Sequence, residues 1–108
     1  MRAMVSDSDF TRVADLLHRD VVRTLGAAHG EYVLRRAAEL RELDLAAADD
    51  KLVEDVQQEV HDTFVDTSWP ACPHHGKHPL WYRDGAWYCE QLGAQVAALG
   101  DLAESLLP

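Results

Sequence analysis

The chain has 108 residues, 47% of them hydrophobic, and its 19 acidic and 10 basic side chains give a net charge of −9. These values fit one globular domain with a modest core rather than a disordered chain. The acidic balance argues against nucleic acid as a partner, because phosphate binding needs clustered lysine and arginine, and it equally disfavours anionic membranes. We therefore expect another protein as the partner, with a homodimer as the alternative.

No segment that would direct the chain to a membrane is evident in the sequence. No apolar run approaches the ~20 residues that a membrane span needs. Asp7, Arg12 and Asp15 interrupt the first residues, which therefore lack the charged-then-apolar pattern of a signal peptide. We expect a cytoplasmic protein, in which Cys72 and Cys89 are thiols or metal ligands rather than a disulfide.

Apolar side chains at helical spacing predict three helices within residues 1–68. The first follows a capping Asp7 or Ser8 and ends or is interrupted between Gly26 and Gly30. The second pattern starts at Glu31. The third covers residues 50–65 and has the clearest apolar stripe, which consists of Leu52, Val56, Val60 and Phe64.

Charged residues cover the opposite face of the third predicted helix. They form a row of carboxylates, Asp55, Glu59, Asp62 and Asp66. A solvated helix face is the interpretation we favour, and a site for cations or a basic partner is the alternative. In the second helix, Arg35 or Arg36 can pair with Glu39, a contact worth ~0.2–0.5 kcal/mol.

Residues 69–90 (WPACPHHGKHPLWYRDGAWYCE) contain both cysteines, half of the six histidines and all three tryptophans. The Asp84-Gly85 dipeptide predicts a two-residue hairpin turn, because both positions of a type I′ turn need positive φ. The flanking segments 80–83 and 86–89 are rich in strand-forming aromatic residues. This stretch therefore predicts a knuckle, which is a tight ligand-bearing turn, followed by a β-hairpin.

The turn also fixes which side chains share a face of the predicted hairpin. Leu80, Tyr82, Trp87 and Cys89 lie on one face, together with His78 by the period of two. Trp81 and Tyr88 lie on the other face. They are candidate partner contacts, because tryptophan and tyrosine are enriched at binding hot spots, although completion of a small core is the simpler interpretation.

The remaining residues, 91–108, predict a last helix with Leu92, Val96, Leu99, Ala103 and Leu106 inward, weakened by Gly93 and Gly100. The predicted fold class is mainly α: three N-terminal helices, a zinc-knuckle-like β-hairpin and a short C-terminal helix. We expect a single domain over 1–108, with a helical part (1–68), the knuckle and hairpin (69–90) and the C-terminal helix (91–108).

Cysteines and histidines near the hairpin have the spacing of metal ligands. Cys72 and His75 form a C-x2-H pair in a tight turn, and His78 follows three residues later. Cys89 returns through the hairpin to the His78 side. Zinc takes about four thiolate or imidazole ligands in a tetrahedron. Zinc is therefore the predicted cofactor, with Cys72, His75, His78 and Cys89 as ligands and His74 as an alternative. A metal-free thiol pair and a disulfide are the competing interpretations.

The same region resembles small treble-clef or zinc-ribbon sites, in which a CP-x-H or CP-x-C knuckle leads into a β-hairpin. It also resembles a WP-x-CP-x-H…HPL…W-x-C motif of small uncharacterised actinobacterial proteins. The matching residues are Trp69, Pro70, Cys72, Pro73, His75, His78, Pro79, Leu80, Trp87 and Cys89. The resemblance implies a zinc site but no activity. A full ribbon has a second ligand pair, whereas Cys89 is followed by Glu90, Gln91 and Leu92, which leaves the fourth ligand open.

The expected function is non-enzymatic: a small zinc-binding protein-interaction or regulatory module, with no catalytic residues assigned. Four protein ligands leave no coordination position for water, which favours a structural metal. If His78 faces away, three ligands plus water describe the alternative, a small metalloenzyme or accessory subunit with an open zinc position. A metal-free helical dimerisation protein is the third alternative.

Overall fold

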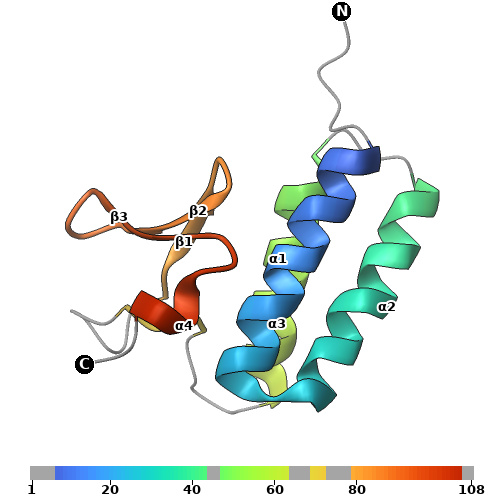
Figure 1. The fold of residues 1–108 in the computed structure, drawn as a ribbon, viewed down its shortest axis with the longest axis horizontal. Coiled ribbons are helices and arrows are strands. Elements are labelled where there is room, and N and C mark those ends of the chain that lie inside the picture. The colour runs from blue at the N-terminus through green and yellow to red at the C-terminus, as the bar shows by residue number, and fades with distance from the viewer. Residues whose placement is uncertain (1–6, 44–46, 64–68, 73–78, 106–108) are drawn as a thin grey trace, which may run out of the picture.

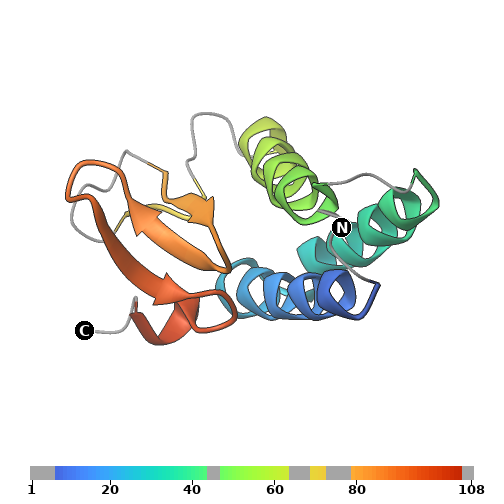
Figure 2. The ribbon, with the colours of Figure 1, turned by 90° about the horizontal axis from the view of Figure 1, so that it is seen from above.

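A computed structural model of the chain describes residues 7–43, 47–63, 69–72 and 79–105. Its elements in chain order are α1 (Asp7–Leu25), α2 (Ala27–Leu43), α3 (Ala48–Thr63), β1 (Trp81–Arg83), β2 (Ala86–Cys89), β3 (Ala94–Ala98) and α4 (Leu102–Ser105). Consecutive long helices run antiparallel in one bundle, and the sheet and α4 lie on the side of α1 and α3 away from α2 (Figures 1 and 2). A mainly α fold with a β-hairpin is thus confirmed. No helix in the described ranges combines the length and apolarity needed to cross a bilayer.

The predicted apolar stripes form the core between the three long helices. Buried side chains include Leu17 and Val21 of α1, Leu40 of α2 and Val56 of α3. Their spacing of three or four residues places them on one face of each helix. The core continues into the sheet, where Trp87 is fully buried.

The two glycines near the first helix junction have different roles. Gly26 has a φ of 104° and ends α1, as expected. Gly30 lies inside α2, which begins at Ala27 rather than at Glu31. A Cβ on Gly30 would lie 2.6 Å from Cγ2 of Val22, so this glycine lets α1 and α2 approach closely instead of breaking a helix.

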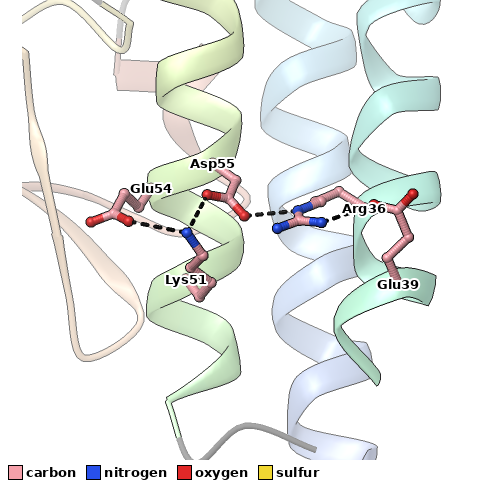
Figure 3. Close-up of polar contacts among 5 residues, drawn as sticks. All are labelled: Arg36, Glu39, Lys51, Glu54 and Asp55. Carbon is pink, nitrogen blue, oxygen red and sulfur yellow. Dashed lines mark hydrogen bonds and ion pairs between the residues drawn. The ribbon is translucent and has the colours of Figure 1, made fainter. Parts of the chain in front are cut away.

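An ion-pair network joins α2 to α3 on the outside of the bundle (Figure 3). The Arg36 Nε donates to Asp55 Oδ2 at 2.8 Å, and the Lys51 Nζ lies 2.9 Å from Asp55 Oδ1. Arg36 also pairs with Glu39 at 3.0 Å, one of the pairs expected from the sequence. Asp55 therefore has two cationic partners, which weakens the alternative in which its carboxylate row binds external cations.

The β-hairpin has the predicted turn and register. Asp84 and Gly85 have φ values of 50° and 78°. Across the hairpin, Trp81 pairs with Tyr88, and Tyr82 pairs with Trp87. The turn chemistry alone was enough to set this register.

The prediction of one helix over the last residues is wrong. Residues 94–98 form β3, which pairs antiparallel with β2, and between Glu90 and Ser105 helical structure is limited to α4. Gly93 and Gly100 both have positive φ, at 64° and 95°. Gly93 directly precedes β3, and Gly100 lies just after it. Leu92, expected inward, is 54% exposed. The hairpin thus forms two strands of a three-stranded sheet. The third strand stabilises it, so a metal is not the only possible source of its stability.

A buried carboxylate on α1 attaches the sheet and α4 to the helices. Asp20 is 0% exposed, and its Oδ2 accepts from the indole Nε1 of Trp87 and the backbone N of Gly100, both at 2.8 Å. Its Oδ1 accepts from the backbone N of Leu102 at 3.0 Å. Burial raises the pKa of Asp20 above 3.8, although the three donors act in the opposite direction. Sequence analysis did not single out this residue.

We expect Asp20→Asn to destabilise the fold, because an amide cannot accept at both ends. Its NH₂ group would face at least one N–H donor that Asp20 now satisfies. The free energy of unfolding should fall by about 1–3 kcal/mol, and further in Asp20→Ala, which leaves all three donors without their acceptor. Urea unfolding of both variants measures this loss. Asp15→Asn, an exposed change on the same helix, is the control, and equal stability of Asp20→Asn and this control would contradict the assigned role.

We expect the Asp55 network to give a pH-dependent contribution to stability. Partial burial raises the pKa of Asp55, but Lys51 and Arg36 outweigh it and hold the pKa below 3.8. A lowered pKa stabilises the fold above the unfolded-state value, and this contribution is lost as the pH falls through the folded-state value.

Asp55→Asn should therefore cost about 1 kcal/mol at pH 6, and the cost should shrink below about pH 3. Urea unfolding of both proteins at the two pH values measures the difference, with Asp15→Asn as the control for an unpaired acid-to-amide change. A cost that stays constant with pH would contradict the ion-pair interpretation.

Candidate metal centre

The segments on either side of residues 73–78 come together in the fold. Ala71 and Pro79 form an isolated antiparallel bridge, and the backbone N of Leu80 donates to the carbonyl of Pro70 at 2.7 Å. Cys72 and Pro79 are therefore the two ends of a short loop closed at its base. Residues 73–78 therefore leave and rejoin the described chain at neighbouring points beside the sheet.

The base of this loop is attached to two helices by side-chain hydrogen bonds. On α3, the Gln57 Nε2 donates to the carbonyls of Trp69 and Leu80, at 3.2 and 3.0 Å. On α1, Thr24 Oγ1 accepts from the Trp69 indole Nε1 at 2.9 Å and donates to the Asp20 carbonyl at 2.7 Å. The Trp69 ring also meets Trp87 edge to face, with centroids 5.5 Å apart. These contacts fix the entrance to the loop without a metal.

The fold brings the two cysteines together. Cys72 and Cys89 are both buried, and they form no disulfide. The Cys72 thiol hydrogen-bonds to the sulfur of Cys89. The sequence argument placed Cys89 on the same face of the hairpin as Leu80 and Trp87, and all three side chains are buried.

The turn after Cys89 directs backbone N–H groups at its sulfur. The Leu92 N–H donates to Cys89 Sγ at 3.4 Å, and the Gln91 N–H also hydrogen-bonds to it. The N–H of Gly93 donates to the Cys89 carbonyl at 2.8 Å and closes the turn. Burial raises the pKa of Cys89, but the Leu92 N–H, the Cys72 thiol and the Gln91 N–H outweigh it, so the pKa lies below 9.0.

Sequence reasoning missed this turn, although a signal was present. Gly93 follows Cys89 by four residues, as Gly76 follows Cys72. A glycine at that distance permits the positive φ that ends such a turn, and Gly93 has a φ of 64°. The incomplete second pair noted in the sequence is thus an intact backbone turn in which Leu92 stands where a second ligand would be.

A pocket of about 230 Å³ lies beside the thiols, and its described lining includes Cys72, Cys89, Pro79, Trp81 and Glu90. The predicted imidazole ligands His75 and His78, and the substitute His74, lie outside the described residues. Within the described ranges, no three His, Cys, Asp or Glu side chains are placed to hold a metal ion. The structure thus brings the two cysteines together, and all four metal ligands stay predictions.

The two candidate contact residues on the other hairpin face differ in exposure. Trp81 is 47% exposed, whereas Tyr88, its cross-strand neighbour, is half-buried. A second pocket of about 300 Å³ separates Trp81 from α3. Trp81 therefore stands between this pocket and the pocket beside the thiols.

Comparison with protein families, with curated proteins and with solved structures finds no significant match to this chain.

Proposed function

We propose that this chain is a small zinc-binding, non-enzymatic module that contacts another protein, in an interaction or regulatory role. One observation carries the metal part: two buried cysteines that form no disulfide meet at the base of a loop whose sequence contains three histidines. Thiolate and imidazole are the ligands that zinc prefers. The exposed Trp81 next to this base supports the contact part.

Cys72 and Cys89 would supply the two sulfur ligands. His75 and His78 would supply two nitrogens, with His74 as the substitute. Chain connectivity supports this set, because His75 follows Cys72 by three residues and His78 directly precedes Pro79, which pairs with Ala71. The donor set also suits the metal, since N–H groups directed at Cys89 favour a thiolate over a thiol.

The metal would act on the loop rather than on the hairpin. The hairpin already has a third strand, an indole bonded to Asp20 and a base held by Gln57. When bound, zinc would supply a cross-link between residues 72–78 and the end of β2. A structural ion of this kind adds binding free energy to the folded state.

A metalloenzyme with an open zinc position is the second candidate, and the site of Leu92 favours it. This residue occupies the place of a second ligand in the turn after Cys89, so that turn offers one sulfur only. If one histidine does not ligate, water would complete the coordination. X-ray absorption distinguishes the candidates: two sulfurs with two nitrogens support the structural role, and a bound water oxygen supports the enzyme.

Protein purified without a histidine tag should contain about one zinc per chain, and Cys89→Ser should lose most of it, because serine is a poor zinc ligand. Zinc affinity should fall more than about a hundredfold, since even outer-shell changes cost 10–100-fold. Elemental analysis and competition with a chromophoric chelator measure this. His61→Ala, outside the loop, should keep its zinc. Equal zinc in Cys89→Ser and the parent would reject the site.

A gain-of-ligand variant tests the turn after Cys89 directly. Leu92→Cys completes a C-x2-C pair whose backbone already faces the Cys89 sulfur. It should raise zinc affinity about tenfold or more if the ion keeps an open coordination position, and should leave the affinity unchanged if two cysteines and two histidines already fill the four positions. Leu92 is exposed, so the change should cost little stability. Leu92→Ser is the matched control, because serine is close to cysteine in size but is a weak zinc ligand. Equal affinities of the two variants would contradict the open position of the second candidate.

A further inference from the structure

The pocket between α3 and β1 is a preformed groove with an apolar floor. Its floor includes the buried side chains of Trp69 and Leu80. The polar groups beneath it are already paired, because Gln57 donates to the carbonyls of both residues. A ligand that covers this floor therefore leaves the carbonyls of Trp69 and Leu80 with their hydrogen-bond donor.

The two walls of this groove have different chemistry. Trp81 forms one wall. It is one of four exposed large apolar residues among those described, with 47% of its surface exposed. Glu54 of α3 forms part of the other wall, with its side chain 75% exposed. Glu54 has a weak contact with Lys51 at 3.6 Å, but Lys51 lies closer to Asp55, at 2.9 Å. Lys51 is thus shared between Glu54 and Asp55, and a second cation at the groove would compete with it for the Glu54 carboxylate.

The charge around the groove is acidic. Its described lining contains one acid, Glu54, and one histidine, His61, but no lysine or arginine. On the far side of Trp81, Glu90 lines the pocket beside the thiols. Arg83 lines a further pocket together with Trp81, Tyr88 and Glu90, so an acid and a base both lie on that side of the indole. The whole chain has a charge of −9, which adds a longer-range attraction for cations.

We propose that this groove binds a lysine or arginine side chain presented by an exposed segment of a partner protein. The cationic group would lie over the Trp81 indole and near the Glu54 carboxylate, where ring and carboxylate both attract it. Its hydrocarbon stem would cover the floor formed by Trp69 and Leu80. The proposal specifies the partner of the interaction module proposed above, and rests on that role.

The size of the groove supports one side chain rather than a larger ligand. Its volume of about 300 Å³ is at the lower end of the range for small-molecule sites. The surrounding charge disfavours an acidic peptide or a nucleic acid in the same place. A basic segment is thus the occupant that size, aromatic surface and charge together select.

The experiment uses four capped tripeptides, acetyl-Gly-Xaa-Gly-amide, in which Xaa is arginine, lysine, glutamine or glutamate. They are titrated into the ¹⁵N-labelled full chain, and the Trp81 indole, the Gln57 side-chain amide and the Leu80 amide are followed by NMR. We expect the arginine and lysine peptides to shift these signals and to bind at least about fivefold more tightly than the glutamine peptide. The glutamate peptide should not bind. Added salt should weaken the cationic peptides.

Matched variants locate the binding. Trp81→Ala should abolish it, and Glu54→Gln should weaken it about two- to fivefold. Leu34→Ala, which removes a side chain of similar exposure on α2, and Glu42→Gln should have no effect. Equal binding of the glutamine and arginine peptides, or wild-type affinity in Trp81→Ala, would overturn the proposal. Self-association that removes the signals before any peptide is added would also overturn it, because a second copy would then occupy the groove.

Zinc is measured on the same samples, so that the two proposals can fail separately. Arginine binding by protein that takes up no zinc when zinc is supplied would support the groove and reject the metal site. Zinc-loaded protein that ignores all four peptides would reject the groove and leave the metal site standing.

Discussion

The buried carboxylate of Asp20 is the interaction on which the rest of the structure depends. Desolvation of a carboxylate is costly, and Asp20 offsets it with donors from β2, from Gly100 and from the start of α4. A carboxylate suits this place because both of its oxygens accept, and all three donors are N–H groups. One side chain of α1 thereby fixes the position of two segments that are far from it in sequence.

The loop that carries the histidines depends on this anchor and on a second one. Trp87, bonded to Asp20, packs edge to face against Trp69, and Gln57 holds the carbonyls of Trp69 and Leu80. Both anchors consist of protein groups alone. The meeting of Cys72 with Cys89 is therefore a result of the fold, and the proposed metal would bind to thiols that are already close.

Local chemistry explains which parts of this fold could be predicted from the sequence. Asp84-Gly85 fixed the hairpin register, since few dipeptides accept two positive φ angles. Strand β3 was missed because its alanine-rich residues fit a helix by periodicity, and only pairing with β2 decides against it. Asp20 was missed for a similar reason. Its structural role depends on hydrogen-bond donors from distant parts of the chain, and the spacing around Leu17 and Val21 does not reveal them.

The candidate site shows the same division between local and distant information. The hairpin register placed Cys89 on one face with Leu80 and Trp87, yet the N–H groups around its sulfur depend on the turn that Gly93 closes. Pro79 connects the two proposals, because it lines both the pocket beside the thiols and the groove next to Trp81. Its bridge to Ala71 already holds it in place, so this shared wall depends on neither a metal nor a partner. Each proposed site can therefore be tested while the other is empty.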